Sequence, residues 1–310
     1  MQATRQALGG ARWHFQHGPI DLVIAAEGDA QTVALAHEQA WQRFQGLLPE
    51  LVAELPALRA PVGEHCPLQG SVARLMWQVC LPYRQPFITP MAAVAGAVAQ
   101  TVLEAYRRPG VRRAWVNNGG DIALHLTPGQ SARVGLYADL ARLDVPQLLH
   151  GLNLDGQLDI PAHWPVRGVA TSGWRGRSFS LGIADSVTVL AATAAQADAA
   201  ATVIANAVQA EHPAIERAPA NTLRDDTDLG SRRVTVQVGP LPEGVVSGAL
   251  QQGLEKAEEL RAAGLVWFAL LCCQGQIRAT AAPAALDGPA PPLFQALTQT
   301  GRTEVGSVFA

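Results

Sequence analysis

The order of the predicted strands and helices constrains the fold of this chain more than any other feature. Hairpins are predicted near both ends, one at 11–26 around the turn Gly18-Pro19 and one at 265–281. The helices predicted between them are rich in small residues, and strands do not alternate regularly with helices. This arrangement favours an α+β fold over a doubly wound sheet.

Capping residues locate the predicted helices. Asp29 and Thr193 each precede a helical pattern, and Thr89-Pro90 places a hydroxyl cap before a proline in the first turn. Pro49 is predicted to open a second helix that ends near residue 58. Further helices are expected at 71–80, from 90 to about 107, from 194 to about 210 and at 245–263.

Strands are predicted at 113–116, 122–126, 132–137, 166–171, 179–183, 186–191 and 234–238. The last hairpin pairs 265–272 with 276–281. We expect one domain at 1–282, followed by a loose C-terminal tail at 283–310 that is rich in Pro, Gly and polar residues.

The charge balance excludes some classes of partner. Lys and Arg number 23 and Asp and Glu 26, and this net charge of −3 argues against a nucleic-acid-binding protein. The longest apolar stretches, 91–99 and 265–273, are far shorter than the roughly 20 residues of a membrane-spanning helix. No signal peptide is visible, and the four cysteines lack paired metal-ligand spacing. We therefore expect a cytoplasmic protein without membrane or nucleic-acid partners.

The first candidate site is the turn Asn117-Asn118-Gly119-Gly120-Asp121. Glycine permits positive φ angles, so several backbone N–H groups can point in one direction and bind a phosphate or the edge of a nucleotide. An ordinary hairpin turn is the alternative, although such a turn needs only one Asn-Gly pair.

The second candidate site is formed by Asp198 and Thr202, which lie four residues apart on a predicted helix and therefore on one face. A carboxylate and a hydroxyl offer two hard oxygens to Mg²⁺, which commonly keeps phosphate oxygens as further ligands. The pair thus indicates a phosphorylated ligand. In the alternative, the Thr202 hydroxyl bonds back into its helix and Asp198 is exposed.

The third candidate site is the run Thr171-Ser172-Gly173-Trp174-Arg175-Gly176-Arg177. Small hydroxyl residues with glycines and arginines are typical of phosphate binding, because a guanidinium can donate two parallel hydrogen bonds to a phosphate. The alternative is a solvent-exposed hairpin, in which Trp174 either stacks on a ligand ring or packs at the rim.

In this order the segments resemble the ApbE superfamily, whose best-known members are FAD:protein FMN transferases. The matching runs are Ala92-Ala93-Val94-Ala95-Gly96-Ala97-Val98-Ala99, Asn118-Gly119-Gly120-Asp121-Ile122, Thr171-Ser172-Gly173, Ser186-Val187-Thr188-Val189 and Ala197-Asp198-Ala199-Ala200-Ala201-Thr202. The likeness covers roughly 11–210, and it is closer still to a shorter, largely uncharacterised ApbE-like family of UPF type, which shares 88–99 and 168–185.

The resemblance implies a T-fold-like core of antiparallel sheets packed with Ala-rich helices, and it implies FAD or a related nucleotide with Mg²⁺ near the pyrophosphate. It places the metal at Asp198, Thr202 and the backbone carbonyl of Ala95. With the motifs above, the nucleotide-binding candidates are Asn117, Asn118, Gly119, Gly120, Asp121, Thr171, Ser172, Gly173 and Arg175. In the transferases a hydroxyl of an acceptor protein attacks the FMN phosphorus while Mg²⁺ neutralises charge.

Two departures from the transferases bear on activity. The transferases carry a Lys where this chain has Gly96, and a His-containing run where it has Ser180-Leu181-Gly182-Ile183-Ala184-Asp185, so Asp185 is the one catalytic candidate. We expect an Mg²⁺-dependent protein that binds FAD or a related nucleotide, with flavin-transferase chemistry on a protein acceptor as its enzyme form.

Two alternatives remain from the sequence. One is a non-transferase ApbE-like protein of cofactor or sulfur metabolism, in which Cys66 or Cys80 carries a thiol-bound group. The other is a structural homo-oligomer in which the helices of small residues pack closely.

Overall fold

The computed structural model describes residues 2–9, 11–136 and 156–281, so the expected tail at 283–310 lies outside the described residues. The chain divides into two compact units. The first contains 1–132, 161–170 and 191–199, and the second contains 133–160, 171–190 and 200–310. The expectation of a single domain at 1–282 stays a prediction.

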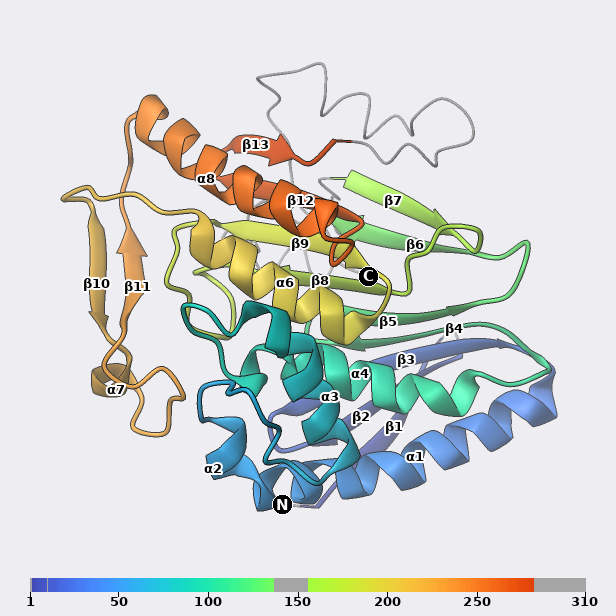
Figure 1. Ribbon diagram of the computed structural model, residues 1–310. Coiled ribbons are helices and arrows are strands. Elements are labelled where there is room, and N and C mark those ends of the chain that lie inside the picture. The colour runs from blue at the N-terminus through green and yellow to red at the C-terminus, as the bar shows by residue number, and fades with distance from the viewer. Residues whose placement is uncertain (1, 10, 137–155, 282–310) are drawn as a thin grey trace. The chain divides into compact units, whose positions relative to one another are not determined.

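The strands of Figure 1 are β1 (Thr4–Leu8), β2 (Arg12–His17), β3 (Ile20–Gly28), β4 (Val111–Asn118), β5 (Asp121–Leu126), β6 (Ser131–Leu136), β7 (Gly156–Pro161), β8 (Gly168–Ser172), β9 (Ser186–Ala191), β10 (Ile215–Pro219), β11 (Arg233–Val238), β12 (Phe268–Cys273) and β13 (Gln276–Ala279). The α-helices are α1 (Ala30–Ala53), α2 (Leu55–Leu58), α3 (Ser71–Cys80), α4 (Val94–Leu103), α6 (Ala194–Ala207), α7 (Ala220–Leu223) and α8 (Glu243–Ala262). Three short 3-10 helices are η1 (Leu81–Tyr83), η2 (Pro90–Ala93) and η3 (Glu104–Tyr106).

The first unit is built on antiparallel strands in the order β1-β2-β3-β4-β5-β8. In β3 the residues Ile20, Leu22 and Ile24 are buried and alternate with half-buried ones, as a strand with one core face requires. Helix α1 packs against β2 and β3, and α4 packs against β4 and β5 (Figure 1). Phe15 contacts Phe44 at a ring-centroid distance of 5.4 Å and anchors this core.

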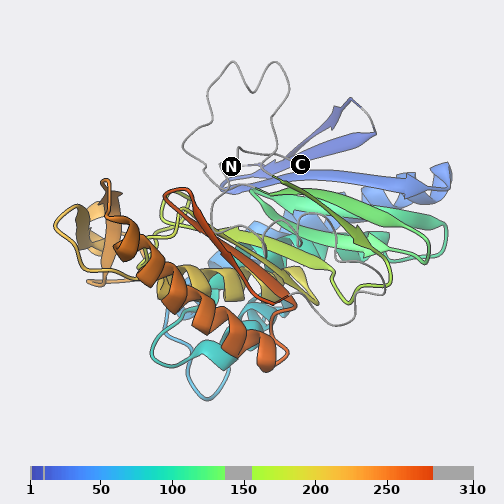
Figure 2. The same cartoon turned by 90° about the horizontal axis from the view of Figure 1, so that it is seen from above.

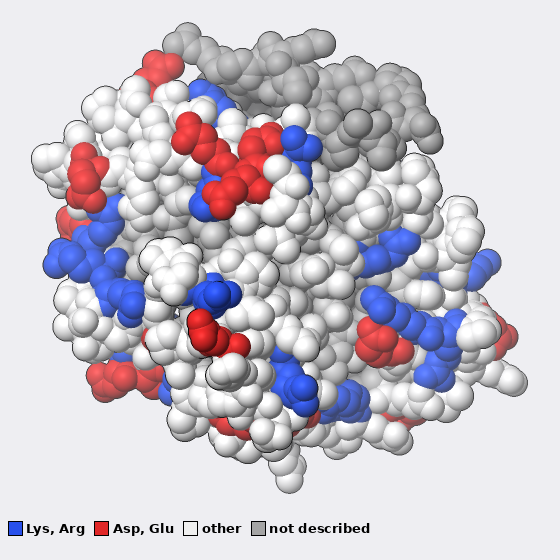
Figure 3. All heavy atoms as spheres, in the orientation of Figure 1, with Lys and Arg blue, Asp and Glu red and all other residues white. Residues whose placement is uncertain are grey.

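The second unit contains β9, β12 and β13 in the order β9-β12-β13, with antiparallel pairing throughout. Helix α8 lies alongside β12 and β13 (Figure 2), and all six residues of β12 are buried. Acidic side chains gather over the outer face of α8 (Figure 3), where Lys256 pairs with Glu259 and Arg261 with Glu258. The strands β10 and β11 form a separate hairpin.

The α+β fold class is confirmed, and so are both terminal hairpins and the Asp29 cap, which accepts a 2.9 Å hydrogen bond from the Thr32 N–H. The prediction for Pro49 is wrong, because this residue lies inside α1 and the next helix, α2, begins at Leu55. Pro49 is exposed, whereas its neighbours Leu47 and Leu51 are buried, so packing of the flanking turns holds the helix together.

The strand predicted at 179–183 is also absent from the structure. The backbone N–H of Leu181 donates to the Asn206 side chain, and the N–H of Ile183 donates to the Val208 carbonyl. The end of α6 thus takes the backbone hydrogen bonds that a neighbouring strand would have taken.

The predicted helix from 90 begins as η2, without a capping hydrogen bond from the Thr89 side chain, and its α-helical part ends at Leu103. The helix predicted to about 210 ends at Ala207. Within the described residues, no helix is both long and apolar enough to cross a membrane.

Candidate functional site

Several of the residues singled out by the motifs meet at the start of α4 in the first unit. Asp198, on α6, accepts a 2.8 Å hydrogen bond at Oδ2 from the N–H of Gly96, and the N–H of Ala95 also donates to this carboxylate. The carbonyl of Ala95 accepts a 3.1 Å hydrogen bond from Asn118 Nδ2. Ala95, Gly96, Asn118 and Asp198 together are called the Asp198 cluster below.

The sequence at the start of α4 explains why a carboxylate lies next to this end of the helix. The N-cap residue of α4 is Ala93, whose side chain cannot accept a hydrogen bond, so the first N–H groups of the helix need acceptors from elsewhere. Asp198 supplies an acceptor, and its negative charge is favourable at the positive end of the helix dipole. The contact thus joins the start of α4 to α6.

Glycine is required at position 96 by the same contact. A Cβ atom there would lie 2.3 Å from the carbonyl oxygen of Ala194 and 2.9 Å from the Cβ of Asp198, which is closer than real atoms approach. The Lys that transferases carry at this position would therefore push α4 and α6 apart. The packing of the first unit therefore requires glycine at the position where the transferases carry Lys.

The electrostatic environment of Asp198 is unusual for a carboxyl group. The residue is half-buried, and loss of solvation raises the pKa of Asp198 to about 7, against the opposing effect of the hydrogen bonds from Gly96 and Ala95. In the described part of the chain no Lys, Arg or His pairs with this carboxylate. Its charge is therefore available to a cation.

The donor set suits Mg²⁺ better than a metal that needs a dense cluster of side chains. Among the described residues no three His, Cys, Asp or Glu side chains gather as metal ligands. Mg²⁺ is commonly held by one or two carboxylates together with waters and substrate phosphates, and it prefers hard oxygens. The Asp198 carboxylate and the Ala95 carbonyl are oxygens of this kind, and both belong to one hydrogen-bonded cluster.

The turn beside the Asp198 cluster is a two-residue hairpin. Asn118 pairs with Asp121 across β4 and β5, and Gly119 and Gly120 have φ angles of 66° and 112°. The N–H of Gly120 donates to the Asn117 side chain at 2.8 Å, so this donor is used within the turn. The turn therefore has the geometry of an ordinary β-hairpin, which was the alternative to a phosphate-binding turn. Phosphate binding by this turn stays a prediction.

Asp185 lies in the second unit and is held by several donors. Its Oδ1 accepts a 3.1 Å hydrogen bond from Trp174 Nε1 and lies 3.5 Å from Arg175 Nε, while its Oδ2 accepts a 2.5 Å hydrogen bond from the Gln274 N–H. Asp185 is only 5% exposed, and the Arg175 guanidinium lies over the Trp174 ring. These contacts tie the 173–185 loop to the turn between β12 and β13, and the catalytic role of Asp185 stays a prediction.

The remaining predicted residues also fall in the second unit, namely Thr171, Ser172, Gly173, Arg175 and Thr202. Thr171 Oγ1 lies 2.9 Å from Thr188 Oγ1, and Gly173 packs tightly because a Cβ there would lie 2.3 Å from the Asp185 carbonyl oxygen. No hydrogen bond within the described residues ties the Thr202 hydroxyl back to its helix. Their participation in a nucleotide or metal site stays a prediction.

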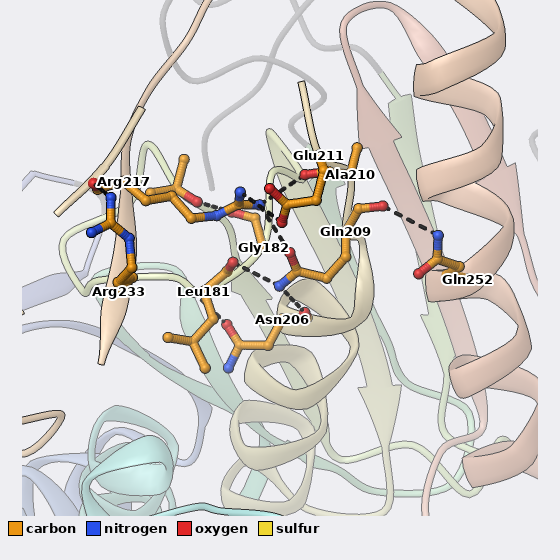
Figure 4. A network of polar contacts seen from close by, with 10 residues as sticks. Leu181, Gly182, Asn206, Gln209, Ala210, Glu211, Arg217, Arg233 and Gln252 are labelled. Atoms are coloured by element: carbon orange, nitrogen blue, oxygen red, sulfur yellow. Dashed lines mark hydrogen bonds and ion pairs between the residues drawn. The ribbon is translucent and has the colours of Figure 1, made fainter. Parts of the chain in front are cut away.

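A polar network that the sequence analysis missed holds the segment leading to Asp185 (Figure 4). Asn206 Oδ1 accepts a 2.9 Å hydrogen bond from the Leu181 N–H, and Gln209 Nε2 donates to the Leu181 carbonyl at 2.7 Å. Arg217 Nη2 in turn donates to Gln209 Oε1 at 2.9 Å. These residues come from α6, the segment after it and β10, and no motif links positions so far apart in sequence.

The cysteines bear on the thiol-carrier alternative. All four are free, and Cys80, Cys272 and Cys273 are buried, whereas Cys66 is half-buried. Burial raises the pKa of the Cys80 thiol well above its ordinary value, and the nearby Asp198 charge raises it further. Because the thiolate is the reactive form, this environment argues against Cys80 as a thiol carrier.

A family model described as "AbpE bacteria" matches residues 3–279 of the chain. A UPF0280 protein of Methanothermobacter thermautotrophicus is 40% identical over 163 residues, which cover 50% of this chain but only 57% of that relative. A UPF0280 protein of Methanopyrus kandleri is 33% identical over 205 residues, which cover 64% of this chain and 75% of that protein.

Among solved structures, the flavinyl transferase ApbE of Pseudomonas stutzeri, in its apo form, aligns at 13% identity with a TM-score of 0.45, over 90% of this chain and 94% of its own. The family assignment rests on the family model and on the UPF0280 relatives, whose identity exceeds 30%. The chain belongs to the AbpE bacteria family, together with the UPF0280 proteins.

Proposed function

We propose that this protein binds Mg²⁺ together with FAD or a related nucleotide at the Asp198 cluster and acts at the phosphates of that nucleotide. The observation that carries this proposal is the Asp198 carboxylate, which is half-buried, has no cationic partner in the described part of the chain and belongs to the same hydrogen-bonded cluster as the Ala95 carbonyl. The choice of a flavin nucleotide rests on the resemblance of the motifs to those of the ApbE superfamily.

The residues of the cluster would each contribute to binding. Asp198 in its ionised form and the Ala95 carbonyl would hold the metal ion, and the Asn118 amide keeps that carbonyl in place. Gly119 and Gly120 carry no side chains, so a phosphate can approach the backbone beside Asn118 closely. When bound, Mg²⁺ would supply charge neutralisation and polarisation of the phosphoryl oxygens.

A second candidate function is nucleotide binding without transfer to an acceptor protein. Gly96 is packed against Ala194 and leaves no room for a Lys side chain, and both Asp185 oxygens already accept hydrogen bonds. A transferase that activates an acceptor hydroxyl needs a base within hydrogen-bond reach of that hydroxyl, and Asp185 is only 5% exposed. These two observations favour a binding protein, or an enzyme that uses another nucleophile such as water.

Thermal unfolding with FAD, FMN or ADP, each with and without Mg²⁺, tests the proposal. A ligand that binds only the folded state adds about 2.7 kcal/mol of stability at 100 times its dissociation constant. We expect FAD to raise the unfolding midpoint only in the presence of Mg²⁺, and Asp198→Asn to abolish this shift. Asp159→Asn, which alters an exposed carboxylate paired with Arg133, is the matched control and should keep it.

Analysis of the nucleotide after incubation separates an enzyme that acts at the pyrophosphate from a protein that only binds the nucleotide. An enzyme acting at the pyrophosphate releases AMP from FAD, whereas a binding protein returns FAD unchanged. An unfolding shift that is equal in the wild-type protein and in Asp198→Asn would contradict the proposed site.

A further inference from the structure

A separate pocket lies in the first unit, at the opposite end of β5 from the Gly119-Gly120 turn. Its volume is about 560 Å³, within the range of small-molecule sites, and it begins where Leu126 ends the strand. Leu126 and Asp121 are the two ends of this six-residue strand, about 17 Å apart for an extended chain. The pocket is therefore distinct from the Asp198 cluster.

Apolar groups form much of the pocket wall. Leu126, Pro128, Pro161 and Ala162 contribute carbon atoms, and among the described lining residues Arg167 and His163 have side chains that can carry a positive charge. A ligand of this pocket therefore contacts an apolar surface and a guanidinium group together.

The guanidinium of Arg167 donates to neutral backbone groups only, and some of its N–H donors remain for a ligand. Nη1 donates to the carbonyls of Trp164 at 2.8 Å and Val166 at 2.6 Å, and Nη2 donates to the Ala162 carbonyl at 2.7 Å. These three acceptors are neutral backbone groups, and three of the five N–H donors of a guanidinium are used. In the described part of the chain no carboxylate pairs with Arg167.

The surroundings make this charge costly without a counter-charge. Arg167 is half-buried, and its burial together with the nearby positive charge of Arg107 lowers the pKa of its guanidinium. Arg107 itself pairs with Glu104, an exposed carboxylate, at 3.0 Å. Removing a charge from water without an opposite charge is unfavourable, so an anion in the pocket would be stabilised by Arg167.

We propose that this pocket is a binding site for a small organic monocarboxylate. Its carboxylate would accept hydrogen bonds from the remaining donors of Arg167, and its apolar body would contact Leu126, Pro128 and Pro161. A single negative charge on the ligand matches the half-buried guanidinium of Arg167, and an apolar body matches the apolar wall. The site does not depend on Asp198 or on a metal ion.

Isothermal titration with benzoate as the probe tests this site in the full-length protein. We expect saturable binding with a dissociation constant of about 1 mM or lower, and at least about tenfold weaker binding of the neutral analogue benzamide, which lacks the charge that Arg167 recognises. Inorganic phosphate, an anion without an apolar body, should also bind at least about tenfold more weakly than benzoate. Equal affinity for benzoate and benzamide, or no saturable binding of benzoate, would overturn the proposal.

Three variants locate the binding. Arg167→Gln removes the charge and should weaken benzoate binding at least about tenfold, whereas Arg12→Gln, at an exposed arginine on β2, should leave it unchanged. Since Arg167 also holds three carbonyls and its replacement can disturb folding, Ala162→Leu provides a second test that narrows the pocket and keeps the guanidinium. Undiminished binding in both Arg167→Gln and Ala162→Leu would overturn the proposal. Asp198→Asn should retain benzoate binding, which separates this test from that of the proposed function.

Discussion

Gly96 is the residue at which α4 and α6 come into backbone contact. A Cβ atom there would lie 2.3 Å from the Ala194 carbonyl oxygen, so we expect Gly96→Ala to lower the free energy of unfolding by about 1–3 kcal/mol. Gly248, an exposed glycine in α8 with no atom within 4 Å of its Cβ position, is the matched control. Gly248→Ala should raise stability by about 0.5–1 kcal/mol. Urea unfolding measures both, and changes of the same sign would contradict the close approach at Gly96.

Asp198 is expected to make stability fall as the pH rises. Its pKa is about 7 in the folded protein and 3.8 for the ordinary group, so between these values the folded state keeps a proton that the unfolded state has released. The stabilisation from this group is complete below about pH 3.8 and is lost as the pH rises through 7, with a slope of about 1.4 kcal/mol per pH unit. In EDTA at pH 5 and pH 7, the wild-type protein should lose more unfolding free energy than Asp198→Asn. Equal losses would contradict the raised pKa.

The candidate site was only partly predictable at the scale of residues. The four-residue spacing of Asp198 and Thr202 singled out the carboxylate, because helical periodicity is a local property, and its role as a metal ligand stays a prediction. Its actual partners, Gly96 and Ala95, lie about 100 residues earlier in the sequence. No local pattern predicts that a carboxylate accepts hydrogen bonds from the first turn of a helix at that separation. Arg167 was not predictable from the sequence, because its proposed role depends on the absence of a carboxylate partner in space, within the part of the chain that the structure describes.

Among the elements, α1 gives a direct test, because it contains a proline in its interior. Pro49 cannot donate the backbone hydrogen bond that an interior helical residue makes, and it is exposed, so its side chain contributes little packing. We expect Pro49→Ala to raise the free energy of unfolding by about 1–3 kcal/mol. Pro56, in the first turn of α2 where that N–H has no partner within the helix, is the control and should change little. A loss of stability in Pro49→Ala would show that the proline is accommodated without cost.

The elements themselves were predictable where local chemistry decides them. The turn Gly18-Pro19, the Asp29 cap and the alternation in β3 each depend on neighbours in sequence, and the structure confirms them. The region 179–183 has strand-like composition, yet it gives its hydrogen bonds to the end of α6. Pro49 likewise suggested a helix start, but burial of Leu47 and Leu51 outweighed the local preference.

At the scale of the whole molecule, the environments of the thiols predict their reactivity. Cys66 is half-buried and the other three cysteines are buried, so a thiol reagent should modify one cysteine quickly in the native protein and four in denaturant. Cys66→Ser should remove the fast reaction. Rapid modification of more than one thiol in the native protein would contradict the burial of Cys80, Cys272 and Cys273. Cys80 would then again be a candidate thiol carrier.

The most direct test of the proposed function is a titration of FAD at pH 8, followed by the change in flavin fluorescence, in Mg²⁺ and in EDTA. At this pH most Asp198 carboxyl groups are ionised, since their pKa is about 7. We predict that FAD binds the wild-type protein at least about tenfold more tightly in Mg²⁺, a difference of about 1.4 kcal/mol, and that Asp198→Asn binds equally in both buffers. Equal affinity of the wild-type protein in Mg²⁺ and EDTA, or an undiminished effect of Mg²⁺ in Asp198→Asn, would contradict a metal-dependent nucleotide site at Asp198.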